Sequence, residues 1–194
     1  MNQNDARVRY TKEVIRKAFL ELLREKNVAR ITVKELCEKS GINRATFYKH
    51  YADVYDLMEQ IESALLDEEK QMLQSMKLSS MEDMYRATLQ ELRNHKDEWN
   101  SLFGWNGDPH LLYRQMELIR TFSFPLLARK FPDLSKEKQE LVYSYLLQGS
   151  GSIIYSWMKD ETLPLEETVE LLSALTSGVC QAAFRLSEQE GQKK

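Results

Sequence analysis

Apolar residues recur at helical spacing along nearly the whole chain, and this periodicity restricts the fold more than any other feature. In residues 11–27 the apolar side chains fall on one face of a helix: Val14, Ile15, Ala18, Phe19, Leu22 and Leu23. No stretch shows the alternation of apolar and polar residues that a half-buried strand would have. The 194 residues include only 7 glycines and 4 prolines, which lie mostly at boundaries between helical segments. The sequence therefore predicts an all-α protein.

Capping and turn residues divide this pattern into nine helices. We expect them at residues 11–27, 33–40, 44–50, 53–76, from 80 onward, 98–103, 109–130, 135–159 and 164–186. Thr11 and Asp53 are the expected N-caps of the first and fourth helices. Pro125 is expected to kink the seventh helix or end it early, because proline has no N–H to donate. The acidic run 67–69 is expected on a solvated face, and the tail after residue 187 is expected to fray.

Charge is distributed unevenly along the chain, although its net value is only −3. Residues 1–51 contain 12 Lys and Arg against 6 Asp and Glu, whereas the remainder contains 15 against 24. The first segment therefore carries +6 and the second −9. A basic segment suits a polyanion such as DNA, and an acidic one does not. We therefore predict a DNA-binding domain at 1–52 and a second domain at 53–194.

Residues 32–51, TVKELCEKSGINRATFYKHY, carry the signals of two short helices joined by a tight turn. Thr32 and Glu35 match a T-x-x-E capping box, in which each side chain binds the backbone N–H of the other residue. Gly41 follows the first short helix, where a residue with positive φ is required. Asn43 is a suitable N-cap for the second helix. This pattern predicts a helix-turn-helix whose second helix can lie in the major groove of DNA.

The second short helix offers side chains that suit DNA. Arg44 can donate two hydrogen bonds to a guanine edge, whereas Lys49 and its neighbours can reach phosphate oxygens. Phe47 is expected on the inner face. The predicted DNA-contacting residues are Thr32, Lys34, Asn43, Arg44, Ala45, Thr46, Tyr48, Lys49 and His50. A solvated amphipathic hairpin is the alternative for this segment, but the coincidence of capping box, turn glycine, basic face and charge asymmetry favours DNA binding.

The segment GINRATFYKHY, residues 41–51, resembles the signature of the TetR/AcrR family of bacterial transcriptional regulators. The resemblance covers about residues 10–60 of the chain. It implies a three-helix DNA-binding head on a six-helix body, and a homodimer that binds double-stranded DNA at a palindromic operator. It also implies that residues 53–194 form an effector-binding and dimerisation domain.

One position departs from the family's pattern. Members of the family commonly have a lysine near the start of the fourth helix, where it approaches a phosphate, but Val54 stands there in this sequence. Tyr55, or the backbone N–H groups at the start of that helix, could supply this contact instead.

The last two helices are expected to form the dimer interface that the resemblance implies. The stretch YLLQGSGSIIYSWMKDETLP resembles a branch of TetR-like proteins of Gram-positive bacteria, some of which regulate small-metabolite operons, including dihydroxyacetone utilisation. The small residues 149–151 permit close approach of helices, and the resemblance implies a two-fold, four-helix contact. The predicted interface residues are Leu141, Tyr145, Gln148, Ser152, Leu175, Val179 and Ala182.

Large aromatic side chains between residues 99 and 124 suggest an effector pocket, although a helical core needs such residues too. The predicted pocket residues are Trp99, Phe103, Trp105, Tyr113, Met116 and Arg120. We accordingly expect a small-molecule effector or a partner protein to bind within residues 77–134.

Other functional classes find little support in the sequence. Cys37 and Cys180 have no ligand-like spacing, so neither a disulfide nor a metal site is expected, and Cys37 is expected in the core. No catalytic triad, HExxH or phosphate-loop motif occurs, so we expect neither an enzyme nor a cofactor. The absence of a signal peptide or a membrane-spanning run predicts a cytoplasmic protein. We therefore predict a DNA-binding transcriptional regulator, with repression the expected outcome; the alternative is a TetR-like adaptor or coactivator that acts through another protein.

Overall fold

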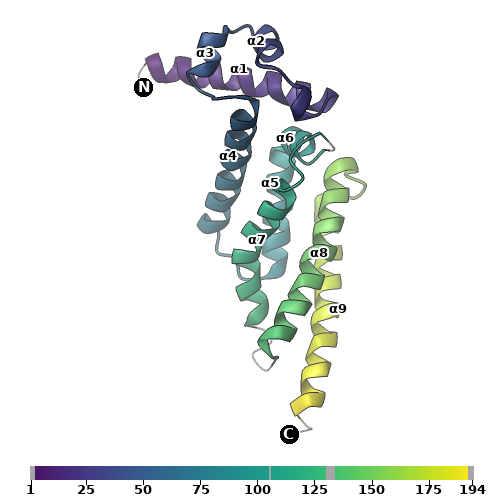
Figure 1. The fold of residues 1–194 in the computed structure, drawn as a ribbon. Helices are drawn as coiled ribbons and strands as arrows, with labels where there is room; N and C mark the ends of the chain where they lie inside the picture. The colour runs from purple at the N-terminus through teal and green to yellow at the C-terminus, as the bar shows by residue number, and fades with distance from the viewer. Residues whose placement is uncertain (1–2, 105, 130–133, 192–194) are drawn as a thin grey trace. The chain divides into compact units, whose positions relative to one another are not determined.

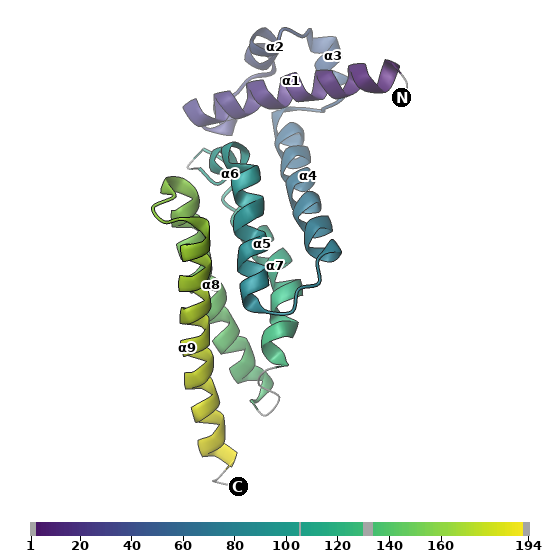
Figure 2. The ribbon, with the colours of Figure 1, turned by 180° about the vertical axis from the view of Figure 1, so that it is seen from behind.

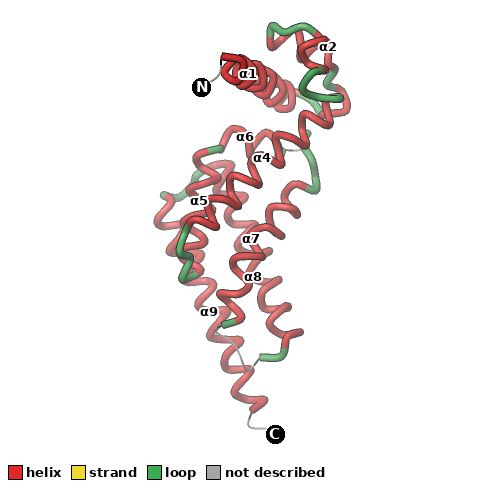
Figure 3. The backbone as a smooth tube through the Cα atoms, turned by 90° about the vertical axis from the view of Figure 1, so that its left-hand side faces the viewer, coloured by secondary structure: helices red, strands yellow, loops and turns green. Residues whose placement is uncertain are grey.

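A computed structural model describes the backbone of residues 3–104, 106–129 and 134–191. These residues form helices and loops, and no strand occurs among them, as Figure 3 shows. The prediction of an all-α protein is therefore confirmed. Over the same residues, no helix is both long enough and apolar enough to cross a lipid bilayer.

The order of the elements follows the predicted order closely (Figure 1). They are α1 (Gln3–Glu25), a 3₁₀ turn η1 (Val28–Arg30), α2 (Val33–Ser40), α3 (Arg44–Tyr48), α4 (Val54–Ser75), α5 (Met81–Asn94), α6 (Lys96–Leu102), α7 (Leu111–Ala128), α8 (Lys136–Asp160) and α9 (Leu165–Gly191).

The first helix is longer than predicted, because α1 begins at Gln3 rather than near Thr11. Thr11 is not an N-cap: its hydroxyl donates a hydrogen bond to the carbonyl oxygen of Arg7, 2.9 Å away, inside the helix. The prediction relied on apolar periodicity, and Ile15 is the first fully buried side chain among the residues of α1 whose burial is described, 6–25. Once a helix has formed, each further residue adds a backbone hydrogen bond, so α1 extends beyond the residues that pack.

Three other helix ends also differ from the prediction. Helix α3 ends at Tyr48, with Lys49 as its C-cap, so His50 lies beyond the helix. Helix α7 ends at Ala128, within one turn of Pro125, which fits the early end expected from proline. Helix α9 continues to Gly191, past the predicted end near residue 186.

Most of the predicted N-caps are confirmed. Asp53 accepts hydrogen bonds through Oδ1 from the N–H groups of Tyr55 and Asp56, at 2.8 and 2.9 Å. The hydroxyl of Ser135 caps α8 by accepting from the N–H of Lys138. These short-range contacts fix where the helices begin, because the first backbone N–H groups of a helix have no partner within it.

The chain divides into two compact units, which are described separately below. The head unit comprises the residues up to Glu68 together with 97–113, and the body unit comprises 69–96 together with 114 onward. The boundary between the units therefore falls inside α4, and α6 belongs almost entirely to the head unit. The predicted boundary after residue 52 concerns independent domains and stays a prediction.

Helices α1, α2 and α3 form the core of the head unit (Figures 1 and 2). Helix α2 packs on α1, and α3 packs on α2. Their inward side chains are completely buried: Ile15, Phe19, Leu23, Leu36 and Phe47. Burial of such side chains stabilises a small helical unit, because each removes apolar surface from water.

Helix α6 and the loop after it are attached to α1 within the head unit. Arg16 forms an ion pair with Glu98 at 2.5 Å, and Arg24 donates through Nε to the hydroxyl of Ser101 at 2.9 Å. The N–H of Val28 donates to the carbonyl oxygen of Asn106 at 3.3 Å. These contacts hold α6 and the loop after it against α1, although the joined residues are more than 70 positions apart in the sequence.

In the body unit, α5 and α8 pack against α9, and α8 and α9 run alongside each other (Figure 2). One apolar cluster joins the three helices through Tyr85, Leu89, Trp157 and Val169, among others. The hydroxyl groups of Tyr85 and Thr176 share a hydrogen bond of 2.6 Å inside this unit. Burial raises the pKa of the Tyr85 phenol, so it remains protonated.

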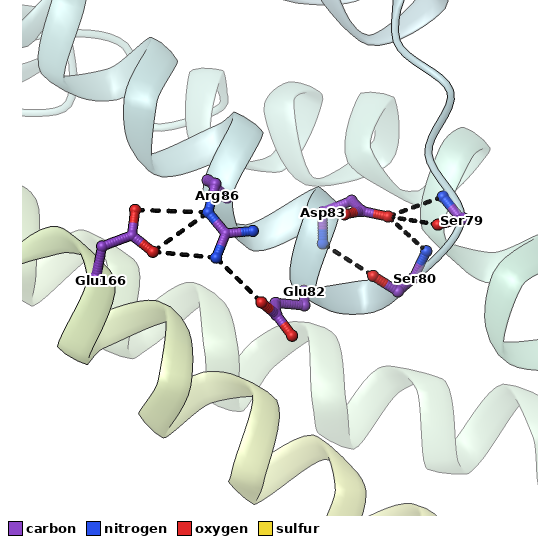
Figure 4. Close-up of polar contacts among 6 residues, drawn as sticks. All are labelled: Ser79, Ser80, Glu82, Asp83, Arg86 and Glu166. Carbon is purple, nitrogen blue, oxygen red and sulfur yellow. Dashed lines mark hydrogen bonds and ion pairs between the residues drawn. The ribbon is translucent and has the colours of Figure 1, made fainter.

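The start of α5 is fixed by polar contacts that Figure 4 shows. Ser80 and Asp83 form a capping box. Three residues on, Arg86 donates through Nη2 to Glu82 and to Glu166 of α9, each at 3.0 Å. Arg86 therefore connects the start of α9 to α5 by an exposed ion pair, which is worth at most about 1 kcal/mol.

A layer of buried polar side chains crosses the body unit one helical turn from an apolar cluster. The cluster contains Leu73, Met84, Ala87 and the partly buried Ile119. One turn along the same helices lie Glu69, Thr88, Glu91 and Gln115, each no more than 7% exposed. The amide of Gln115 donates to both carboxylate oxygens of Glu69, at 3.2 and 3.4 Å.

Glu69 contradicts the prediction that the acidic run 67–69 lies on a solvated face. Its side chain is completely buried, whereas Asp67 and Glu68 are exposed. Burial raises the pKa of the Glu69 carboxyl group to about 8, because the charged form loses its hydration. The carboxyl group is therefore largely neutral near pH 7.

Candidate nucleic-acid interface

The turn between α2 and α3 has the geometry that a helix-turn-helix requires. Gly41 has a φ of 70°, a left-handed conformation that glycine adopts without a Cβ penalty. The N–H groups of Gly41 and Ile42 both donate to the carbonyl oxygen of Cys37. Cys37 is buried, as predicted, and burial raises the pKa of its thiol. The turn thus ends α2 abruptly and redirects the chain into α3.

Helix α3 presents its polar residues to solvent and one aromatic residue to the core. Arg44 and Ala45 are exposed, and the Tyr48 side chain is 57% exposed. Phe47 is completely buried, and its ring lies 5.5 Å from those of Tyr48 and Tyr51. Because Phe47 holds the helix in place, the opposite face is rigidly presented.

Two predicted contact residues use part of their hydrogen-bonding capacity within the head unit. Asn43 accepts through Oδ1 from the N–H and the hydroxyl of Thr46, at 2.8 and 3.0 Å. The amide NH₂ of Asn43 and the methyl group of Thr46 are the parts left to meet a base. The hydroxyl of Thr32 also donates to Glu35, at 2.9 Å, so its proton is already used within the head unit. The predicted contact of Thr32 with DNA stays a prediction.

The remaining predicted contacts are cations and aromatic groups near the ends of the two short helices. Lys34 is exposed on α2, 3.8 Å from Glu38, and Lys49 is exposed at the end of α3. His50 is half-buried, with its ring 6.2 Å from that of Tyr51. The positions of these residues suit contacts to phosphate oxygens, although their roles stay predictions.

The start of α4 limits the substitutes for the missing family lysine. Val54 is buried, so its side chain is directed into the protein. The N–H groups of Tyr55 and Asp56 are bound to Asp53, which removes two of the backbone donors considered from the sequence. The Tyr55 side chain is 52% exposed and remains a candidate for a phosphate contact.

Ion pairs hold α2 against α1. Lys26 pairs with Glu35 at 2.5 Å, and Lys39 pairs with Glu21 at 3.1 Å. The hydrogen bonds from Lys26 and Thr32 hold the pKa of Glu35 down at about 2. Glu35 is therefore ionised throughout the physiological range, and its charge supports both the cap and the ion pair.

Sequence reasoning missed the cations of the N-terminal part of α1. The ammonium group of Lys12 lies 5.9 Å from the centre of the Tyr51 ring, just after the end of α3. Arg9 precedes Lys12 by three residues and so lies on the same side of the helix. The sequence signal was available, since Arg7, Arg9 and Lys12 contribute to the positive charge of the first segment.

The predicted effector residues are distributed over both units. In the head unit, Trp99 is completely buried and stacks on Phe103 at 4.9 Å, whereas Tyr113 is 65% exposed. In the body unit, Met116 is half-buried, and Arg120 pairs with Glu140 and lies over the rings of Phe124 and Tyr143. Trp105 lies outside the described residues. The predicted pocket stays a prediction.

The predicted dimer residues form an exposed, largely apolar face of the body unit. Leu141 and Tyr145 of α8 are 71% and 69% exposed, and Leu175 of α9 is 50% exposed. Gln148, Ser152 and Ala182 are also exposed, whereas Val179 is half-buried. A groove of about 180 Å³ between α8 and α9 is lined by Tyr145, Gly149, Leu175 and Val179, among others.

Comparison with known proteins places the helix-turn-helix in a family. Residues 15–61 match the model described as "Bacterial regulatory proteins, tetR family". Over 58 residues the chain is 48% identical to an uncharacterized HTH-type transcriptional regulator, YxbF, of Bacillus subtilis. This match covers 29% of the chain and 15% of the relative, so the similarity extends over a small part of that protein's length.

Solved structures match over most of the chain. A TetR transcriptional regulator from Streptococcus agalactiae matches with a TM-score of 0.67 and 20% identity, covering 89% of this chain and 97% of the other. A putative transcriptional regulator from Pseudomonas aeruginosa matches with a TM-score of 0.64 and 17% identity, covering 90% and 92%. These structures share the fold, and the match at residues 15–61 supplies the sequence link. At residues 15–61 the chain therefore carries the DNA-binding segment of the TetR family of bacterial regulatory proteins, within a fold that it shares with TetR-type regulators.

Proposed function

We propose that the protein is a sequence-specific DNA-binding repressor that acts as a homodimer and is controlled by a small molecule or a partner protein. The observation that carries this proposal is the exposed face of α3, with Arg44, Tyr48 and Lys49 presented from a helix that the buried Phe47 fixes. This helix lies within the segment that matches the family.

The chemistry of α3 divides into base contacts and phosphate contacts. Arg44 stands at the start of the helix and can bind a guanine edge through two hydrogen bonds. Lys49 stands at its end, where an ammonium group binds phosphate without regard to sequence. Arg44 therefore contributes to specificity, and Lys49 contributes mainly to affinity.

The exposed face of α8 and α9 supports the dimer. Large apolar side chains such as Leu141, Tyr145 and Leu175 are unusual in contact with water when they lie together on one face. A Cβ atom added at Gly149 or Gly178 would meet no other atom of the described chain within 4 Å, so a second copy can approach closely there. Stable interfaces of this kind bury on the order of 1,000 Å² or more.

Contacts within the head unit support control by an effector. Glu98 and Ser101 of α6 belong to the region expected to recognise the effector, and both bind arginines of α1. A ligand that displaced α6 would therefore also displace α1, on which the helix-turn-helix packs. An effector needs a difference in affinity of only about 1–3 kcal/mol between two conformations to change DNA binding.

The test is DNA binding by the full chain and two variants of α3. The probes are a duplex from the region upstream of its own gene and a mixed-sequence duplex. We expect Arg44→Ala to lose about 1–3 kcal/mol on the upstream duplex and much of the preference for it, if Arg44 is bidentate. Lys49→Ala should weaken binding to both duplexes about equally. Lys136→Ala, which removes an exposed cation of the body unit, is the control and should behave as the wild type.

Repression is tested in the same framework with a reporter gene placed behind the upstream region. We expect expression to rise when the gene for the protein is deleted or carries Arg44→Ala. Wild-type DNA affinity in both α3 variants would refute the assignment of α3. A protein that binds neither duplex at low salt would instead favour the adaptor, which acts through a partner protein.

A further inference from the structure

The N-terminal part of α1 extends beyond the packed head unit. We call residues 6–13 the α1 overhang. Its side chains are exposed, apart from the half-buried Thr11, and they include Val8 at 38% and Tyr10 at 67% exposure. A helix that leaves an aromatic and a branched side chain in water is suited to contact with another molecule.

The charge of the overhang indicates what that molecule is. It carries three cations, Arg7, Arg9 and Lys12, against one carboxylate, Glu13. One arginine side chain can donate two hydrogen bonds to the oxygens of a phosphate, and a tyrosine hydroxyl can donate to phosphate as well. The composition therefore suits a polyanion better than an apolar or acidic surface.

The overhang is also continuous with the proposed DNA-binding surface. Lys12 lies over the ring of Tyr51, two residues after Lys49 at the end of α3. Arg9 lies one turn further along the same side of α1. The cations of α1 therefore begin next to those of α3 and lead away from them along one helix. From Val14 back to Gln3, α1 extends about 16 Å, which equals about five base-pair steps of DNA.

We infer that the α1 overhang is a second DNA-contacting element, which binds phosphates flanking the bases read by α3. This inference rests on the proposed function, because a head that does not bind DNA has no flanking phosphates to contact. The overhang adds affinity and footprint length but no base preference. Its contribution depends on ionic strength, since each neutralised phosphate releases counterions.

The test measures the salt dependence of binding by the full chain to a long mixed-sequence duplex, between about 50 and 200 mM salt. We expect Arg7→Ala/Arg9→Ala to reduce the slope of log K against log salt by roughly 2 and to weaken binding about tenfold. Arg7→Lys/Arg9→Lys keeps both charges and should keep the slope. The control is Arg30→Ala/Lys136→Ala, which removes two exposed cations at other places and should leave the slope unchanged.

The outcomes separate this inference from the proposed function. A slope that stays the same in Arg7→Ala/Arg9→Ala, while Lys49→Ala weakens binding, overturns the inference and leaves DNA binding by α3 intact. The overhang would then serve a partner of another class. Absence of DNA binding by the wild type overturns both. Far-UV circular dichroism of each variant shows whether α1 has kept its helix, and a reduced slope with unchanged helicity supports the contact itself.

Discussion

In the head unit, Glu35 accepts hydrogen bonds from Lys26 and Thr32, which hold its pKa at about 2, whereas in the body unit burial raises the pKa of Glu69 to about 8. The first carboxyl group lies near the surface beside a cation, and the second lies within a packed core. The two units therefore place the same functional group in opposite charge states at neutral pH. At these two positions, the head unit holds an ionised carboxylate near its surface and the body unit holds a neutral carboxyl group in its interior.

This difference shows how each unit is suited to its part in the proposed function. Surface cations suit a unit that binds a polyanion, because each cation that neutralises a phosphate releases counterions. A buried polar layer such as Glu69, Thr88 and Gln115 costs free energy unless its members are paired, and it restricts how the helices pack. The body unit also has an exposed apolar face, which a second copy would cover in the proposed dimer.

The largest expected effect comes from a charge placed on that apolar face. In Leu175→Asp, dimerisation would bury two carboxylates near the two-fold axis, each at a cost of several kcal/mol. We expect the dissociation constant of the dimer to rise by at least about 1,000-fold, and operator affinity to collapse with it. Sedimentation equilibrium and DNA titration measure the two effects. Leu175 is preferred to Val179, because Val179 also packs within the monomer.

Leu112→Asp is the matched control, since Leu112 is 36% exposed and lies in the head unit. It should leave the oligomeric state unchanged. A Leu175→Asp protein that remains a dimer at micromolar concentration would show that the interface lies elsewhere. A wild type that is monomeric and still binds its operator with high affinity would contradict the proposal that DNA binding by the head unit requires dimerisation through the body unit.

The second prediction concerns Glu69 and pH. The folded-state pKa of about 8 exceeds the ordinary value of 4.5, so the folded state binds the extra proton between these limits. Stability therefore falls as pH rises from 4.5 to 8, and the full penalty, on the order of 5 kcal/mol, is present above pH 8. Glu69→Gln should remove most of this dependence. Urea unfolding of wild type and variant at pH 6 and pH 9 provides the measurement.

Asp67→Asn is the control for this experiment, because Asp67 is exposed two residues before Glu69 on α4. Its unfolding should follow the wild type at both pH values. If Glu69→Gln and the wild type lose stability equally between pH 6 and 9, Glu69 does not carry the buried proton. Glu35 and Glu69 would then not differ in charge at neutral pH as described above.

The smallest expected effect is the loss of a cap in the head unit. Thr32→Ala removes the hydroxyl that binds the N–H of Glu35, and N-cap losses of this kind cost about 1 kcal/mol. Glu35 has a lowered pKa, so its stabilising contribution is present above pH 4.5 and is lost as pH falls toward 2. We expect a lower melting temperature at neutral pH and a weaker loss of stability on acidification. Thr32→Ser keeps the hydroxyl and should restore both.

The parts of the molecule that the sequence predicts well are those set by residues close together in the chain. The capping box at Thr32, the turn at Gly41 and the N-cap at Asn43 each involve contacts over a few residues, and all three are confirmed. Their types are restricted by backbone geometry, so the pattern is specific. The helix-turn-helix could therefore be predicted almost completely.

The parts that the sequence predicts poorly depend on packing between distant residues or on the absence of packing. The acidic run 67–69 predicts a solvated face, yet Glu69 lies four residues after the buried Leu65 and four before the buried Leu73. That spacing was the available signal. The α1 overhang carries no apolar stripe, so periodicity could not indicate where the helix begins. The ion pair between Arg16 and Glu98 joins positions 82 residues apart, so no local sequence pattern could predict it.

The shortness of α3 has a consequence for the information that the protein can read. Five residues of helix extend about 7.5 Å, which matches about two to three base pairs. Three fully specified base pairs recur by chance about once in 64 positions, and two such half-sites at fixed spacing recur about once in 4,000. A bacterial genome with millions of positions would still contain on the order of a thousand such matches. Discrimination must therefore draw on more than these base contacts and their spacing, and sequence-dependent DNA stiffness can supply it, so the operator is defined as much by its mechanics as by its base sequence.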